Sequence, residues 1–255
     1  MLNCPVCDNE KWLKAYKIGQ WAIDECVVCG FAKINPMPTQ ESRPEFFTND
    51  NIVKRKIKKF SALQRFSRVM KRVSNKVLRR GKSEIFYKEL LSCLFPGAKI
   101  LDVGCGDGSF LALASKKFIC SGIEISGHLA NLAKAREGLN IKLGNFLEAD
   151  FVGEKYDGIT LISLLEHLTD PAGTFQKCFD LLNDKGVLLV KTVNYGCANR
   201  KIKKENWIGF RPPDHVVYFD ASNLKRMLEK IGFKKVEPSS WIFNDNMYCT
   251  AWRLK

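Results

Sequence analysis

Strand-like and helical patterns alternate over the C-terminal two thirds of the chain. Two helical segments, 127–137 and 171–182, and a third at 222–231 with Ser222 as its N-cap and Gly232 at its end, have amphipathic spacing. Short runs rich in Val, Ile and Leu predict buried strands at residues 99–103, 119–125, 140–143, 158–163, 187–193, 234–238 and 247–253. This alternation predicts an α/β domain over residues 83–255, with a mostly parallel sheet and helices on both faces.

The N-terminal third follows a different pattern. Residues 1–48 contain paired cysteines and end in a Pro-rich stretch, which predicts a boundary. In residues 49–82, apolar side chains from Ile57 to Val77 recur at spacings of three and four, so we expect an amphipathic helix. The chain thus divides into a cysteine module, a helical linker and the α/β domain.

Length and cysteine usage favour a cytoplasmic protein. A chain of 255 residues can bury a full core and carry a small accessory module. It has neither an apolar run long enough to span a membrane nor a basic leader followed by an apolar segment. Two close pairs account for four of the ten cysteines and the others are scattered singly, which is typical of a reducing compartment.

The net charge of +14 is concentrated in one segment. Between Asp50 and Glu84 there are many Lys and Arg residues and no acid. Residues 54–82 therefore have three interpretations, namely a helix with a solvated basic face, a helix that lies on an anionic membrane surface, or a contact for phosphate groups of RNA or a nucleotide-sugar. Few aromatic residues are placed for base stacking, so nucleic acid is the less favoured partner. Membrane contact would place the protein peripherally at the inner membrane surface.

A glycine loop follows the first predicted strand of the α/β domain. Gly104, Gly106 and Gly108 come directly after Asp102 and before a helix. Glycine tolerates positive φ and lets a ligand approach the backbone closely. Taken alone, the pattern also fits a simple turn between a strand and a helix.

Glu124 gives the loop a chemical context. It closes the next strand, about twenty residues after the first glycine, where a carboxylate can accept both ribose hydroxyls of a bound nucleoside. A dinucleotide site would have the same acid, but its glycine pattern normally lacks the leading Asp. The loop and Glu124 together favour a nucleoside cofactor.

With these residues, the chain from about 83 to 255 resembles the class I methyltransferases that depend on S-adenosylmethionine (SAM). The segment Leu165-Glu166-His167-Leu168 and Asp170-Pro171 is similar to a signature of the subgroup that acts on small molecules and sugars, including O-methyltransferases of the ubiquinone pathway. The resemblance implies a Rossmann-like seven-stranded sheet and SAM as cofactor. It also implies cofactor-binding roles for Asp102, Gly104, Cys105, Gly106, Gly108, Glu124, Ile125, Asn145, Phe146, Ser163 and Leu164.

Two positions depart from the family pattern. The family usually has Asp where this chain has Asn145, although Asn still offers a carbonyl oxygen to the adenine amino group. Some relatives hold a divalent metal with acids and the histidine of the signature, and Ser163 stands where an additional acid would be needed. This speaks against a metal in the active site.

Methyl transfer is an in-line displacement, and a hydroxyl or acidic carbon acceptor also needs a base. His215 and His167 are the candidate bases near the predicted site, each with a structural role as the alternative, whereas His128 is expected on a helix surface. The loops after the fifth strand offer Tyr195, Trp207 and Arg211 as substrate contacts. These three side chains could equally serve packing or solvation.

The N-terminal cysteines form two Cys-x-x-Cys pairs, Cys4 with Cys7 and Cys26 with Cys29. Four thiolates at this spacing can bind a structural zinc ion in a zinc-ribbon-like module, with rubredoxin-like iron or free cysteines as the alternatives. Similar modules occur in sugar C-methyltransferases and in ribosomal RNA guanine methyltransferases. The module alone does not choose the substrate.

The sequence therefore predicts a SAM-dependent methyltransferase that acts on a small-molecule, sugar or lipid-linked glycan acceptor. An RNA base methyltransferase is one alternative, and a non-catalytic protein that binds zinc or SAM is another. The acceptor atom (O, N or C) and the oligomeric state stay open.

Overall fold

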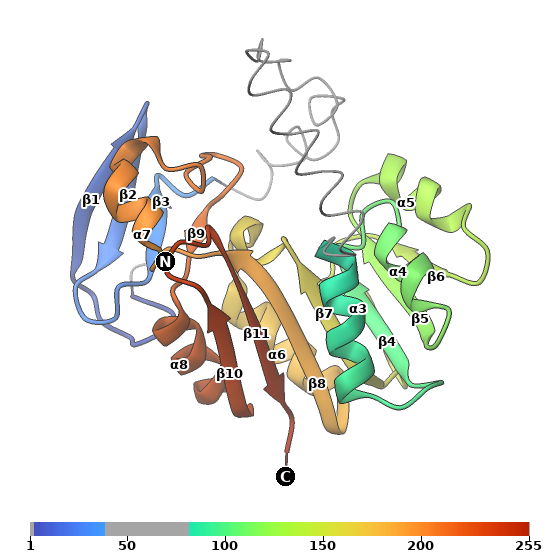
Figure 1. The fold of residues 1–255 in the computed structure, drawn as a ribbon. Coiled ribbons are helices and arrows are strands. Elements are labelled where there is room, and N and C mark those ends of the chain that lie inside the picture. The colour runs from blue at the N-terminus through green and yellow to red at the C-terminus, as the bar shows by residue number, and fades with distance from the viewer. Residues whose placement is uncertain (1–2, 39–81, 255) are drawn as a thin grey trace.

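We analysed a computed structural model that describes residues 3–38 and 82–254 (Figure 1). The basic helix predicted for residues 49–82 lies almost wholly outside these residues, as does the predicted boundary at residue 48. Among the described helices, none is long and apolar enough to cross a membrane.

A seven-stranded sheet forms the centre of the molecule, which confirms the predicted fold class. In spatial order its strands are β10 (Lys234–Ser240), β11 (Asn246–Trp252), β8 (Leu182–Val193), β7 (Tyr156–Ile162), β4 (Lys99–Val103), β5 (Ile119–Glu124) and β6 (Asn140–Leu143). Only β11 runs antiparallel to its neighbours β8 and β10. The carboxyl ends of the other strands therefore meet at one edge of the sheet, where ligands bind in such folds.

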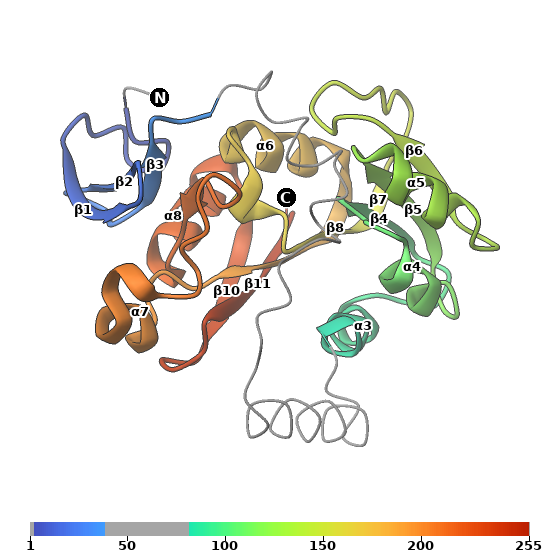
Figure 2. The ribbon, with the colours of Figure 1, turned by 90° about the horizontal axis from the view of Figure 1, so that it is seen from above.

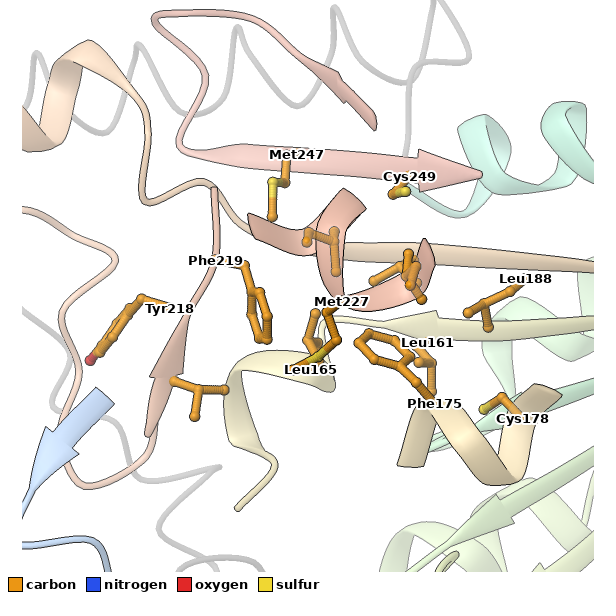
Figure 3. Close-up of a cluster of buried hydrophobic side chains, with 14 of the residues drawn as sticks. Leu161, Leu165, Phe175, Cys178, Leu188, Tyr218, Phe219, Met227, Met247 and Cys249 are labelled. Atoms are coloured by element: carbon orange, nitrogen blue, oxygen red, sulfur yellow. The ribbon is translucent and has the colours of Figure 1, made fainter. Parts of the chain in front are cut away.

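Helices cover both faces of this sheet, as the alternation predicted (Figure 2). One face carries α3 (Lys82–Cys93), α4 (Ser109–Ala114) and α5 (Gly127–Lys134), and the other carries α6 (Pro171–Leu181) and α8 (Ala221–Ile231). Alternate residues of a strand point to opposite faces, so Val187 and Leu189 pack in one core while Leu188 and Val190 pack in the other. Figure 3 shows the second core, with Phe175 of α6 and Met227 of α8 against Leu161 and Leu188.

The ends of α8 show one wrong and one correct prediction. Asp220, and not Ser222, is the N-cap, because its carboxylate accepts the amide of Asn223 at 2.9 Å while the Asn223 side chain accepts the Asp220 amide at 3.0 Å. This reciprocal capping box satisfies two backbone donors at once, which a serine two residues later cannot do. Gly232 ends the helix at φ 123°, as predicted.

The N-terminal module forms a second, smaller sheet that is completed by the α/β domain. Strands β1 (Trp12–Ile18), β2 (Trp21–Cys26) and β3 (Ala32–Asn35) are antiparallel, and β3 also pairs with β9 (Val217–Tyr218). Phe31 of the module packs on Phe219 at 4.8 Å between ring centroids. The module and the C-terminal part of the chain thus share a sheet and a core.

Candidate functional site

The loop between β4 and α4 has the backbone shape that its glycines predicted. Gly104, Gly106 and Gly108 all have positive φ, at 72°, 57° and 74°. A Cβ added to Gly104 would lie 2.9 Å from Leu164 Cδ1, whereas at Gly106 nothing lies within 4 Å. The loop is closely packed on one side and open at Gly106, where a ligand can approach the backbone.

Glu124 is fixed by backbone amides at the end of β5. Its two carboxylate oxygens accept hydrogen bonds from the amides of Gly106 and Ser126, each at 2.9 Å. A carboxylate offers about four acceptor positions, so these two bonds leave capacity for a pair of hydroxyl donors. The side chain therefore holds the glycine loop and remains suited to a ribose.

Asp102 lies beneath the loop with only 2% of its surface exposed. Burial raises its pKa to about 7, with the charge of Glu124 adding to the shift, and Thr160 Oγ1 donates to its carboxylate at 2.6 Å. Asp102 can thus change charge near neutral pH, depending on what binds above it.

The structure separates the remaining cofactor candidates into exposed and buried positions. Ile125 is 50% exposed beside Glu124, while Cys105 is buried against Gly122 and burial raises its thiol pKa to about 12. Asn145 accepts the amide of Leu147 and donates to Glu148. Of these side chains, Ile125 and Asn145 are accessible and Cys105 is not.

Phe146 belongs to the core. Its ring packs at an edge on Phe151 at 5.6 Å, and 8% of the residue is exposed. The structure thus places Asn145, rather than Phe146, at the surface after β6.

The carboxyl end of β7 connects the glycine loop with a second group of polar residues. Ser163 has a positive φ of 57°, and Leu164 after it packs on Gly104. The Ser163 hydroxyl accepts a hydrogen bond from Lys191 of β8, whose side chain is buried. Lys191 gave no signal in the sequence because it lies within an apolar strand.

His167 and His215 come together beside this strand end. Their rings lie edge to face with centroids 4.9 Å apart. His167 Nδ1 lies 2.8 Å from the backbone oxygen of Asp214 and 3.1 Å from its carboxylate. Both partners only accept, so Nδ1 carries the proton and Nε2 is the basic atom.

Their surroundings move the pKa values of the two histidines apart. Burial lowers the pKa of His167, but the bond to Asp214 and the charge of Glu166 outweigh it, so the pKa is raised above its usual value. Burial, helped by the positive charges of His167 and Arg211, lowers the pKa of His215 to about 3. His215 is therefore neutral at physiological pH, with Nδ1 donating to the Gly209 carbonyl at 2.7 Å.

Asp214 holds the centre of this cluster. It accepts from His167 and from Arg211, and these partners outweigh burial and hold its pKa well below the usual range. Asp214 is not among the site residues predicted from the sequence. Its bond to a histidine 47 residues away had no local signal.

Glu166, His167 and His215 also have ligand atoms within 4.8 Å of one another, close enough for a cation. The Glu166 carboxylate already accepts from Thr192 Oγ1 at 2.8 Å. The Lys191 ammonium is bonded to Ser163, the position at which the resemblance implies that a metal site would need a further acid. This arrangement fits a divalent metal poorly, because like charges repel.

The predicted substrate contacts occupy two environments. Tyr195 and Trp207 are buried in an aromatic cluster with exposed fractions of 2% and 1%, and they donate to Glu25 at 2.8 Å and to Asp245 at 2.7 Å. Arg211 is partly exposed and pairs with Asp214. Arg211 therefore belongs to the histidine cluster, whereas Tyr195 and Trp207 belong to the buried core.

The four module cysteines converge as their spacing predicted. The Sγ atoms of Cys4 and Cys29, and those of Cys7 and Cys26, lie 3.5 Å apart, and all four lie within 4.8 Å. A tetrahedral ion with bonds of about 2.3 Å separates its sulfurs by roughly 3.8 Å, which falls in this range. Burial raises the pKa of Cys4 to about 11 and also raises that of Cys29, whereas at Cys26 bonds from backbone amides outweigh burial and lower the pKa to about 7. Cys26 is thus the thiolate of the free cluster, and the other thiols would release their protons when a metal ion binds. This donor set fits zinc.

Comparisons with known proteins agree with this geometry. A sequence model of the family described as "Methyltransferase domain" matches residues 65–237. A ubiquinone biosynthesis O-methyltransferase of Actinobacillus pleuropneumoniae is 36% identical over 109 residues, which cover 38% of this chain and 47% of that protein. One of the same name from Dinoroseobacter shibae is 28% identical over 59% of this chain and 65% of its own length. The chain spans about half the length of the curated relatives it matches.

Solved structures of methyltransferases share the fold. Magnesium protoporphyrin IX methyltransferase of Synechocystis PCC 6803, solved with bound S-adenosylhomocysteine, superposes with a TM-score of 0.59 at 17% identity, over 83% of this chain and 97% of that one. A SAM-dependent methyltransferase of Archaeoglobus fulgidus gives 0.52 at 17% identity, over 68% and 95%. The family match covers more than half of the chain, and the chain therefore belongs to the methyltransferase domain family.

Proposed function

We propose that this chain transfers a methyl group from SAM to an oxygen of a small-molecule acceptor. The observation that carries the proposal is the position of Glu124, whose carboxylate is fixed on the open glycine loop at one side of the strand ends, with the His167–Asp214 pair at the other. Relatives named ubiquinone biosynthesis O-methyltransferase support a small-molecule hydroxyl as the acceptor. A sugar hydroxyl, free or lipid-linked, meets the same chemical requirement.

The cofactor side of the site would bind SAM through four contacts. The open backbone at Gly106 would receive the methionine part, Glu124 the ribose hydroxyls, and Asn145 and Ile125 the adenine. Asp102 in its ionised form would favour the positive charges of SAM. When bound, SAM supplies an activated methyl group on a sulfonium.

His167 is the best placed base on the acceptor side. Its Nε2 would take the proton of the acceptor hydroxyl, while Asp214 keeps the proton on Nδ1 and stabilises the charge that develops on the ring. His215 is a weaker base because its pKa is about 3, but its neutral ring can accept a hydrogen bond from the acceptor. The two histidines thus divide the roles of proton acceptor and orienting group.

Methyl transfer can be tested with labelled SAM in cell extracts. Purified chain is incubated with extract that has or has not been treated with nuclease, and the products are separated into small-molecule, lipid and RNA fractions. We expect label in the small-molecule or lipid fraction, insensitive to nuclease. Label confined to nuclease-sensitive material would contradict the proposal and favour an RNA acceptor.

We also propose that Cys4, Cys7, Cys26 and Cys29 hold a structural zinc ion. All four ligands come from the chain, so the ion would stabilise the module that supplies β3 to the strand after His215. Elemental analysis should find one zinc per chain, and its removal by a chelator should lower the melting temperature and the kcat together. One iron per chain, with its visible absorption, would contradict the zinc assignment.

A further inference from the structure

Three consecutive large apolar side chains project from the connection between β10 and β11. Trp241, Ile242 and Phe243 are 76%, 64% and 60% exposed. We call these residues the apolar tip. Single exposed apolar residues are common on protein surfaces, but a contiguous group that includes Trp and Phe marks an interaction site.

A second exposed segment is fastened to the tip. The amide of Ala198, at the start of α7 (Ala198–Lys203), donates to the Ile242 carbonyl at 2.6 Å, and Asn199 Nδ2 donates to the Phe243 carbonyl at 2.8 Å. Both views place α7 beside this connection (Figures 1 and 2). Ile202 of α7 and Ile208, which follows the Trp207 that donates to Asp245, are 71% and 67% exposed, so the segment fastened to the tip carries two further exposed apolar side chains.

Lysines accompany these apolar residues. Lys201, Lys203 and Lys204 are all exposed on α7 and the turn that follows it, and Glu205 is the one acid between residues 198 and 208. We call the three lysines the basic rim. They give the tip a positive border.

We propose that the apolar tip and the basic rim dock on an anionic lipid bilayer. Trp and Phe are favoured at the depth of the lipid headgroups, and lysines beside them can bury their stems while their ammonium groups meet lipid phosphates. Protein interfaces are depleted in Lys, which makes a protein partner the poorer match to this composition.

The docking face lies next to the acceptor side of the candidate site. The tip follows β10 at the edge of the sheet where β4, β5, β7 and β8 also end. Asp245, the last residue of the connection, accepts from Trp207 and from the amide of Asn194, which directly follows β8. Docking would therefore hold the acceptor side close to the membrane surface.

Vesicle binding by the full chain tests this assignment. Cosedimentation with phosphatidylcholine vesicles, with and without phosphatidylglycerol, gives the partition constant. We expect binding to the anionic vesicles and a loss of at least tenfold in the double variant Trp241→Ser and Phe243→Ser. Phe95→Ser is the matched control, because Phe95 is 63% exposed elsewhere on the molecule.

The basic rim is tested in the same way. The double variant Lys203→Gln and Lys204→Gln should bind anionic vesicles about 30-fold more weakly, since each lysine near such a surface contributes about 1 kcal/mol. Lys116→Gln with Lys117→Gln is the matched control, because both residues are exposed in the turn that follows α4. All variants keep residues 54–82, so binding through that segment is common to all of them.

Two results would overturn the proposal. One is the absence of vesicle binding by the unaltered chain, and the other is equal binding by the tip variant and the Phe95→Ser control. If light scattering shows a dimer that the tip variant converts to a monomer, with no vesicle binding, the face joins two copies of the chain instead. Circular dichroism and SAM binding confirm that each variant is folded.

Discussion

The two halves of the candidate site are built differently. On the cofactor side, the loop amide of Gly106 and the carboxylate of Glu124 are 18 residues apart in the chain. On the acceptor side, His167 and Asp214 are 47 residues apart, and the bond from Tyr195 to Glu25 spans 170. One half is a local unit of β4, the glycine loop, α4 and β5, and the other is assembled from distant segments.

This difference explains what each half requires in order to fold. The bond between the glycine loop and Glu124 depends on the pairing of β4 with β5 and on the positive φ of the glycines, and β7 supports it through Thr160. The acceptor half needs β3 of the cysteine module on β9, with the amide of Ile34 on the Val216 carbonyl and the amide of Val216 on the Glu166 carbonyl. A substitution that destabilises the cysteine module should therefore disturb the acceptor half more than the cofactor half.

The largest expected effect is on turnover in His167→Gln. Loss of a positioned base costs about a hundredfold or more in kcat, while SAM affinity should stay within about twofold because the cofactor half is intact. Steady-state kinetics and calorimetry measure the two quantities, with the exposed His128→Gln as the matched control. In the unaltered chain, kcat should rise with pH until it passes the raised pKa of His167. An unchanged kcat in His167→Gln would remove this residue from the reaction.

A second prediction separates the halves by pH. Asp102 has a pKa of about 7, so it ionises as the pH rises from 6 to 8, and SAM affinity should rise with it by at most about tenfold per pH unit. The stability of the chain without cofactor should depend on pH in the opposite direction. The folded chain keeps a proton on Asp102 up to a pH of about 7, whereas the unfolded chain releases it at a pH of about 4. Stability should therefore fall as the pH rises from about 4 to about 7.

Asp102→Asn should remove both of these pH dependences. Calorimetry in two buffers of different ionisation enthalpy would detect the proton that Asp102 releases when SAM binds. If Asp102→Asn kept the same dependence of SAM affinity on pH, the titrating group would lie elsewhere.

The smallest effect is expected where the module meets the acceptor half. Tyr195→Phe removes the hydrogen bond to Glu25 and should lower the free energy of unfolding by about 1 to 2 kcal/mol. We expect a higher KM for the acceptor and an unchanged Kd for SAM. The control Tyr87→Phe alters a ring that packs on Phe118, on the α3 face of the sheet. A weaker affinity for SAM in Tyr195→Phe would show that the two halves are not separable.

The same difference decides how much could be predicted from sequence. The strand and helix order, the glycine loop, Glu124 and the four cysteines each depend on local spacing, and the structure places them as their patterns indicate. Lys191 could not be predicted, because a lysine in an apolar strand gives no sign of its partner Ser163.

For Tyr195 and Trp207, the sequence predicted a role that the packing of the rings does not favour. Their sequence context suggested a substrate loop, yet the structure surrounds both rings with aromatic side chains such as Phe210 and Tyr218. Two of the elements behind that cluster, β1 and β3, come from the cysteine module, and no local pattern near residue 200 announces them. Contacts between segments that are distant in the chain determine the position of Lys191 and the burial of the two rings, so local patterns could not predict either.

The most direct test of the account is a calorimetric titration of SAM into the unaltered chain, Glu124→Gln and His167→Gln. The account predicts one site per chain, equal affinity in the unaltered chain and His167→Gln, and affinity weaker by about 10- to 100-fold in Glu124→Gln, as expected for loss of hydrogen bonds to a charged group. No binding of SAM at millimolar concentration, or equal binding by Glu124→Gln, would contradict it.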